Sequence, residues 1–206
     1  MLLKRRKFSI GVLGALLFVL INDTAATPDL IVDLSRLWNS VVFYPAHIAE
    51  QCEVGAECIF GSGVRRVIKF ETATKNIGNH DLEIGYPDDH PDWYEYSSCH
   101  GHDHFIGFME YAVFSLSCSE FPGGNKMGFY LENVETNDGS PGTIWNGCSR
   151  SRFFGGYNCD YQGIGEGCAD VYGHHLPCQL IDITWTKVFL PPAGGNGYLR
   201  VYRRIL

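Results

Sequence analysis

Three histidines stand at alternate positions in the segment Cys99-His100-Gly101-His102-Asp103-His104. If this segment is extended, residues two apart point to the same side, so the three imidazoles converge. An all-imidazole ligand set favours copper or zinc over calcium or magnesium, which prefer oxygen ligands. Three protein ligands also leave coordination positions open for water or oxygen. The spacing therefore predicts a transition-metal site at His100, His102 and His104.

Other interpretations of the histidines stay open at this point. A surface histidine cluster or an adventitious zinc site would show the same spacing. A zinc hydrolase would need an acidic general base near the metal, and Asp103 is the obvious local candidate. His174 and His175 are candidates for proton transfer because they follow Tyr172 closely in the chain.

The N-terminus has the pattern of a secretory signal. Four basic residues at positions 4–7 precede an apolar run from Phe8 to Ile21, which is short for a membrane span, and small residues follow at positions 24–26. We therefore expect a signal peptide over residues 1–26, a secreted, extracellular mature domain over residues 27–206, and no stable membrane span. An uncleaved membrane anchor is the alternative.

Eight cysteines follow the signal, namely Cys52, Cys58, Cys99, Cys118, Cys148, Cys159, Cys168 and Cys178. An even number in an oxidising compartment predicts four disulfides. The chain has no Cys-x-x-Cys pair, which weighs against a structural zinc site.

Composition and patterning limit the fold and the partners. The net charge of −7 disfavours nucleic acid, and 24 Gly with 9 Pro disfavour a helical bundle. Alternating apolar residues predict strands at 181–186 and 198–205, and short apolar runs predict strands at 66–72, 111–116 and 127–134. Residues 137–167 show neither helical nor strand periodicity. We expect a mostly β, single-domain antiparallel β-sandwich with long disulfide-pinned loops and little helix.

The chain resembles the catalytic domain of the lysyl oxidase (protein-lysine 6-oxidase) family along most of the mature sequence. The resemblance is carried by motifs in the family's order: Pro28-Asp29-Leu30, the Cys52-x5-Cys58 spacing, Arg66 to Phe70 with Lys75 to Gly78, Trp93 to Cys99 with the histidines, Gly124-Asn125-Lys126 with Phe129, Leu131 and Glu132, and Gln162 to Thr184 around Tyr172.

The resemblance implies copper at His100, His102 and His104, and a lysine tyrosylquinone (LTQ) cofactor made from Lys126 and Tyr172. It implies a copper amine oxidase that uses molecular oxygen to convert peptidyl-lysine, or small primary amines, to an aldehyde with release of ammonia and hydrogen peroxide. Its expected partners are basic, lysine-containing extracellular proteins. The alternative is a catalytically silent secreted copper- or zinc-binding structural protein on the same scaffold.

The resemblance also implies disulfides Cys52–Cys99, Cys58–Cys178 and Cys148–Cys168. The family's fourth bridge uses a cysteine where this chain has Tyr130, so we hypothesise that Cys118 substitutes and pairs with Cys159. Three other departures concern residues 94–97, which replace a Trp and a His of close relatives, residues 108–111, where members carry a further His, and the end of the chain, where members have another strand.

Overall fold

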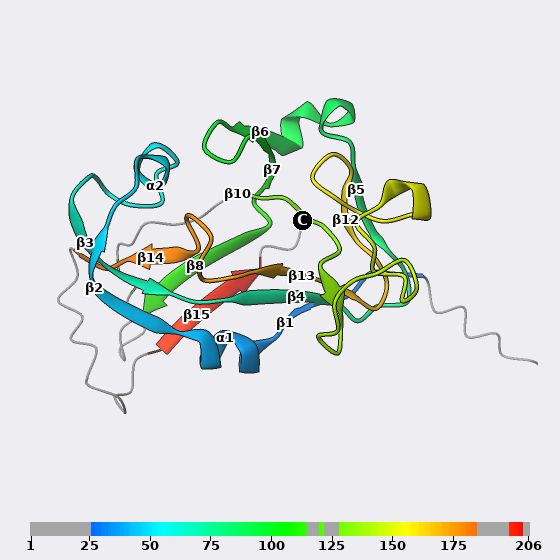
Figure 1. The fold of residues 1–206 in the computed structure, drawn as a ribbon, viewed down its shortest axis with the longest axis horizontal. Helices are drawn as coiled ribbons and strands as arrows, with labels where there is room; N and C mark the ends of the chain where they lie inside the picture. Colours follow the sequence, from blue (N-terminus) through cyan, green and yellow to red (C-terminus); the bar gives the residue numbers. More distant parts are fainter. Residues whose placement is uncertain (1–25, 115–119, 122–127, 185–197, 204–206) are drawn as a thin grey trace, which may run out of the picture.

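A computed structural model describes residues 26–114, 120–121, 128–184 and 198–203 of the chain (Figure 1). The expected signal peptide, Cys118, Lys126 and Trp185 lie outside the described residues, apart from the signal's last position. Within the described part, no helix is long and apolar enough to cross a membrane.

The described strands form five small sheets in which every pairing is antiparallel. A four-stranded sheet has the order β1 (Leu30–Val32), β4 (Thr72–Asn76), β13 (Cys168–Tyr172) and β11 (Glu135–Thr136). A second sheet has the order β14 (Leu180–Asp182), β3 (Val64–Lys69) and β2 (Val42–Ile48). These two sheets carry much of the core.

The third sheet, β10 (Gly128–Phe129), β7 (His102–Ile106) and β6 (Tyr94–Ser97), rises above them at the top of Figure 1. The remaining sheets are β12 (Gln162–Ile164) with β5 (Leu82–Gly85), and β15 (Tyr198–Arg203) with β8 (Met109–Phe114) and β9 (Glu120–Phe121). The short helices are α1 (Leu34–Ser40), α2 (Gln51–Gly55) and the 3-10 helices η1 (Pro87–Asp89), η2 (Pro91–Trp93) and η3 (Arg152–Phe154).

One large hydrophobic cluster joins these sheets. It combines side chains from distant parts of the sequence, including Phe70, Tyr111, Phe129, Leu131, Ile164, Tyr172, Ile181 and Ile183, nearly all of which are fully buried. Since the apolar side chains of strands bury against one another across sheets, the cluster fixes how the small sheets pack. The predicted mostly β, antiparallel fold with little helix is confirmed.

Three disulfides implied by the family resemblance are present: Cys52–Cys99, Cys58–Cys178 and Cys148–Cys168. The third pins the long, largely irregular segment 137–167, as expected. Cys159 has no disulfide partner among the described residues, and Cys118 lies outside them. The pairing of Cys118 with Cys159 therefore stays a prediction.

Several strand predictions need correction. The run predicted at 66–72 is divided between β3 and β4, which belong to different sheets, and Phe70 and Glu71 lie between the two strands. The run predicted at 127–134 forms only the two residues of β10, after which Leu131 bonds to β12 and Val134 to Ala169 instead of joining a ladder. Within the run predicted at 181–186, the polar Asp182 is buried like its apolar neighbours, and its carboxylate accepts hydrogen bonds from the backbone N–H of Phe60 and Thr184.

Candidate metal centre and tyrosine site

The histidines lie on a hairpin formed by β6 and β7. In its register Ser97 is opposite His102 and Glu95 is opposite His104. The strands connect through a turn in which Gly101 has φ +75° and its N–H bonds to the Ser97 carbonyl oxygen at 2.7 Å. A glycine adopts this left-handed conformation without a Cβ clash, so the turn can be tight.

The predicted extended conformation is wrong for one of the three ligands. His102 and His104 are on β7 and share a face, whereas His100 lies in the turn before it. The turn nevertheless brings the imidazole of His100 back over the strand. Its neighbour Cys99 is bonded to Cys52, which fixes the start of the turn to α2.

The three imidazoles converge closely enough to share one metal ion. One ring nitrogen from each lies within 4.8 Å of the other two, and Nδ1 of His100 is 3.0 Å from Nε2 of His104. Ring centroids are 4.9 to 5.8 Å apart. Nitrogen ligands that lie about 2.0–2.1 Å from one ion are separated from each other by distances similar to those between these ring nitrogens. The residues present therefore fit a copper or zinc ion.

Tyr172 ends β13, where it is paired with Thr72 of β4. Its hydroxyl accepts a hydrogen bond from the backbone N–H of Tyr130 at 2.9 Å and donates one to the Tyr130 carbonyl oxygen. Its ring packs edge-to-face on Phe129, with centroids 5.0 Å apart. Burial, and then the nearby charge of Asp170, raise the pKa of the Tyr172 phenol well above its ordinary value.

One cavity joins the histidines to the tyrosine. It has a volume of about 270 Å³, and its lining residues are Cys99, His100, His102, His104, Tyr130, Tyr172, Leu176 and Pro177. The ring of Tyr130 lies between the two groups: its centroid is 4.3 Å from that of His102 and 5.9 Å from that of Tyr172. The predicted metal ligands and Tyr172 thus face the same space.

Lys126 cannot be placed, because it lies outside the described residues. The next described strand after Lys126 is β10, in which Gly128 pairs with Ile106 and Phe129 pairs with Phe105 of β7. Since Phe129 also packs on Tyr172, the strand that follows Lys126 connects the histidine strand to the tyrosine. This arrangement is compatible with the predicted role of Lys126.

Two residues that the sequence did not single out complete the site. Tyr130 binds Tyr172 through its backbone and packs on His102 through its ring. The fully buried Gln162 donates to the carbonyl oxygen of Asp103 on β7 at 2.8 Å and accepts from the N–H of Leu131 at 3.0 Å. The sequence noted Tyr130 only as the residue in place of a family cysteine, and Gln162 only as part of the family resemblance.

The alternative proton-transfer residues gain no support from the geometry. His174 and His175 are exposed and do not line the cavity. The ring of His175 packs against Gly173 instead. Asp103 lies between His102 and His104 on β7, so its side chain points to the opposite face, where it is paired with Tyr96. A zinc hydrolase with Asp103 as its base is therefore disfavoured.

Fold and site together define a disulfide-bonded β protein in which three histidines that could hold a metal ion lie beside a buried tyrosine. The family model "Lysyl oxidase" matches residues 46–189, which is more than half of the chain and includes every residue of the site. The chain belongs to the lysyl oxidase family.

Named relatives agree with this membership. Lysyl oxidase homolog 2A of Danio rerio is 29% identical over 178 residues, covering 81% of this chain and 22% of the relative. Lysyl oxidase homolog 4 of Homo sapiens is 32% identical over 123 residues, covering 59% of this chain and 15% of the relative. The chain thus spans about a fifth of the length of the relatives it matches.

Proposed function

We propose that this chain is a secreted, copper-dependent amine oxidase that acts on peptidyl-lysine or small primary amines. The observation that carries the proposal is the single cavity lined by the three histidines and by Tyr172. Membership of the lysyl oxidase family supports the same activity. The three disulfides support export, because such bonds persist in oxidising compartments.

In the proposed reaction a primary amine, oxygen and water yield an aldehyde, ammonia and hydrogen peroxide. His100, His102 and His104 would hold copper, and Lys126 with Tyr172 would form the quinone. Copper with oxygen would supply the oxidation that makes the quinone, whose carbonyl then accepts the substrate's electrons.

The chain's own residues contribute position and protonation. The backbone N–H and C=O of Tyr130 hold the Tyr172 hydroxyl from two sides, and the Phe129 ring fixes the plane of the phenol. Burial raises the pKa of Tyr172 well above its ordinary value and so favours the neutral phenol. Copper held by His100, His102 and His104 would supply a positive charge that favours the ionised phenol.

The test compares the wild-type chain with Lys126→Arg after secretion in the presence of copper. We expect a peptide cross-link between Lys126 and Tyr172 by mass spectrometry, and peroxide release from butylamine, in the wild type alone. Both proteins should bind copper equally. Lys75→Arg, a conservative change at a lysine far from the histidines in the sequence, is the matched control and should keep the cross-link and the activity.

A copper-loaded, disulfide-bonded wild type without the cross-link would contradict the proposal. That result would favour the alternative, a metal-binding protein without oxidase activity.

A further inference from the structure

The charges of this chain are segregated along its sequence. Between Lys75 and Lys126 there is no Lys or Arg, but there are nine acidic residues: Asp81, Glu83, Asp88, Asp89, Asp92, Glu95, Asp103, Glu110 and Glu120. This interval includes β6, β7 and all three metal-site histidines. The histidine hairpin therefore belongs to a long stretch of the sequence that has acidic residues but no Lys or Arg.

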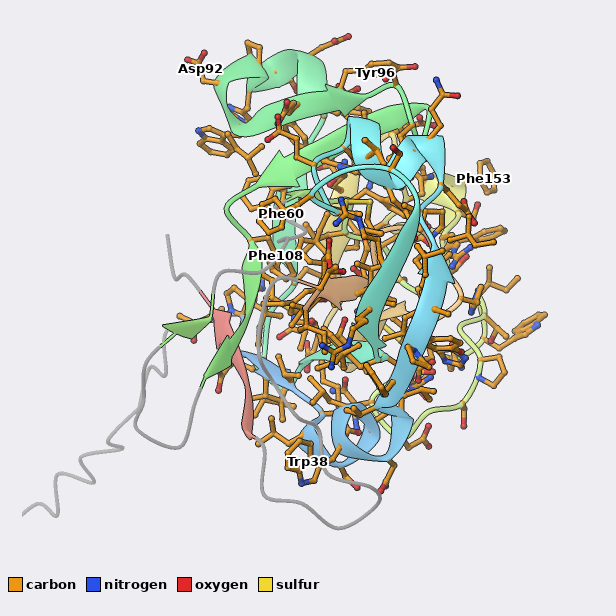
Figure 2. The ribbon with its side chains drawn as sticks, turned by 90° about the vertical axis from the view of Figure 1, so that its left-hand side faces the viewer. Trp38, Phe60, Asp92, Tyr96, Phe108 and Phe153 are labelled. Atoms are coloured by element: carbon orange, nitrogen blue, oxygen red, sulfur yellow. A yellow bond between two sulfur atoms is a disulfide. The ribbon has the colours of Figure 1, made fainter. Side chains whose placement is uncertain are left out.

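Within this interval, residues Tyr86–Ser97 form a surface that we call the β6 ledge, made of η1, η2 and β6. The carboxylates of Asp88, Asp89, Asp92 and Glu95 are exposed. Large aromatic side chains are exposed between them: Tyr86 is 45% exposed, Trp93 47% and Tyr96 63%. Figure 2 shows Asp92 and Tyr96 at the top of the molecule, above the core. Carboxylates attract cations over distance, and aromatic faces bind them at contact.

The ledge includes the edge of a sheet. In the order β10, β7, β6, the strand β6 is terminal among the described strands. An extended peptide can add to such an edge through main-chain hydrogen bonds, with alternate side chains on each face. Charged residues on an edge strand also protect it from aggregation, but protection alone would not require exposed Trp and Tyr side chains.

The register of β6 connects this edge to the metal centre. Glu95 is directly opposite His104 and Ser97 is opposite His102, so these side chains share one face of the sheet. A strand added beside β6 would lie about 10 Å from β7, which is two strand spacings. Every second side chain of the added strand would then lie on the histidine face, where a long lysine side chain extends toward the metal centre.

We propose that the β6 ledge binds an extended, lysine-rich polypeptide segment as an added strand, with exposed carboxylates and aromatic rings holding its cationic side chains. This inference deepens the proposed amine oxidase, on which it rests, by naming the surface that selects a polymeric substrate over a small amine. Small primary amines need only the cavity and would not use the ledge.

The test measures binding of a fluorescent nonapeptide with lysine at alternate positions to the full secreted chain, by anisotropy and without turnover. Asp88→Asn, Asp89→Asn and Asp92→Asn combined should weaken the affinity about tenfold, as expected for three exposed ion pairs. A control with the same loss of charge elsewhere, Glu57→Gln, Asp160→Asn and Glu166→Gln combined, changes exposed residues outside the ledge and should alter the affinity less than about twofold.

A second probe leaves the protein unchanged. Two forms of the same peptide, one N-methylated at the odd-numbered residues and one at the even-numbered residues, differ in which edge of the peptide strand is blocked. The form whose methyl groups face β6 cannot complete a strand ladder and should bind at least about tenfold more weakly than the other. Equal affinities of the two triple variants, or full affinity of both N-methylated peptides, would overturn the proposal.

Because binding is measured without turnover, a chain without oxidase activity would still give a result. Peroxide release from butylamine, measured on the same variants, should be unaffected by the ledge substitutions. Failure of the ledge and failure of the oxidase are therefore distinguishable.

Discussion

The two halves of the site are held in place by different means. Tyr172 ends a strand in the middle of the four-stranded sheet, where the neighbouring residues Ala73 and Ala169 are fully buried and the phenol is 5% exposed. The histidines instead lie on a peripheral hairpin, fixed by a glycine turn and by the Cys52–Cys99 bond. Packing of the core thus positions the tyrosine, whereas a turn and a covalent bond position the metal ligands. Metal affinity and global stability should therefore respond to different substitutions.

The largest effect is expected when one disulfide is removed at a time. This change tests whether the histidines and the tyrosine are positioned separately. Cys52→Ala with Cys99→Ala opens a link across 47 residues, and Cys58→Ala with Cys178→Ala opens one across 120. Loop entropy gives a loss of about 4 to 5 kcal/mol in the free energy of unfolding for each pair. Only the first pair should also weaken copper binding, by at least about tenfold, since it frees the histidine turn.

Urea unfolding measures the loss of stability. Copper titration, under conditions in which both variants stay folded, measures the loss of copper affinity. Equal loss of copper affinity in both variants would show that the hairpin is not positioned separately from the core.

A second substitution acts on the connection between the halves. Gln162→Leu removes the side-chain bonds to the part-buried carbonyl of Asp103 on the hairpin and to the buried N–H of Leu131 beside the tyrosine. Loss of the bond to the buried Leu131 N–H should alone cost about 1–3 kcal/mol. We expect both lower stability in urea and weaker copper binding. An exposed glutamine, Gln51→Leu, is the matched control and should change neither by much; unchanged copper affinity in Gln162→Leu would contradict the link.

The smallest expected effect lies on the tyrosine side, far from the metal. Asp33 caps α1 by accepting from the N–H of Arg36 at 3.0 Å, and its carboxylate bonds to Lys75 of β4 at 2.6 Å. These bonds lower the pKa of Asp33 from its ordinary value of 3.8. Asn caps helices as well as Asp, so Asp33→Asn removes mainly the ion pair.

Because the folded pKa of Asp33 is lowered, its stabilisation is present above pH 3.8 and disappears as the pH falls through the lowered value. Asp33→Asn should therefore reduce stability at pH 7 by at most about 1 kcal/mol, with no loss at low pH and unchanged copper affinity. Urea unfolding at several pH values measures the difference. A loss that is independent of pH would assign the effect to the helix cap instead.

The sequence predicted the parts of this molecule that depend on local spacing. The clustering of His100, His102 and His104 was predicted because three histidines in five residues form a rare pattern, and the family resemblance supplied three disulfides that the structure has. The two-residue alternation failed at Asp182, because a buried carboxylate that receives backbone hydrogen bonds looks polar in the sequence and therefore exposed. Helix α1 was missed, although its capping residue Asp33 was a usable signal.

Tyr130 and the connecting role of Gln162 could not be predicted from spacing. Both act through contacts between segments more than 30 residues apart, namely Tyr130 with Tyr172 and Gln162 with Asp103 and Leu131. Such contacts are set by how the small sheets pack, and a single sequence carries no local pattern for them.

The bond between Cys52 and Cys99 also bears on the proposed loading of the histidines with metal. Their sulfur atoms and a ring nitrogen of His100 lie within 4.8 Å of one another. In a reduced, newly made chain, these two thiolates and the imidazole would compete for a soft metal ion and withdraw His100 from the trihistidine set. Closing the disulfide removes both competing ligands. If the site holds copper as proposed, metal added to the oxidised chain should therefore reach the three histidines, whereas metal added to the reduced chain should be misplaced.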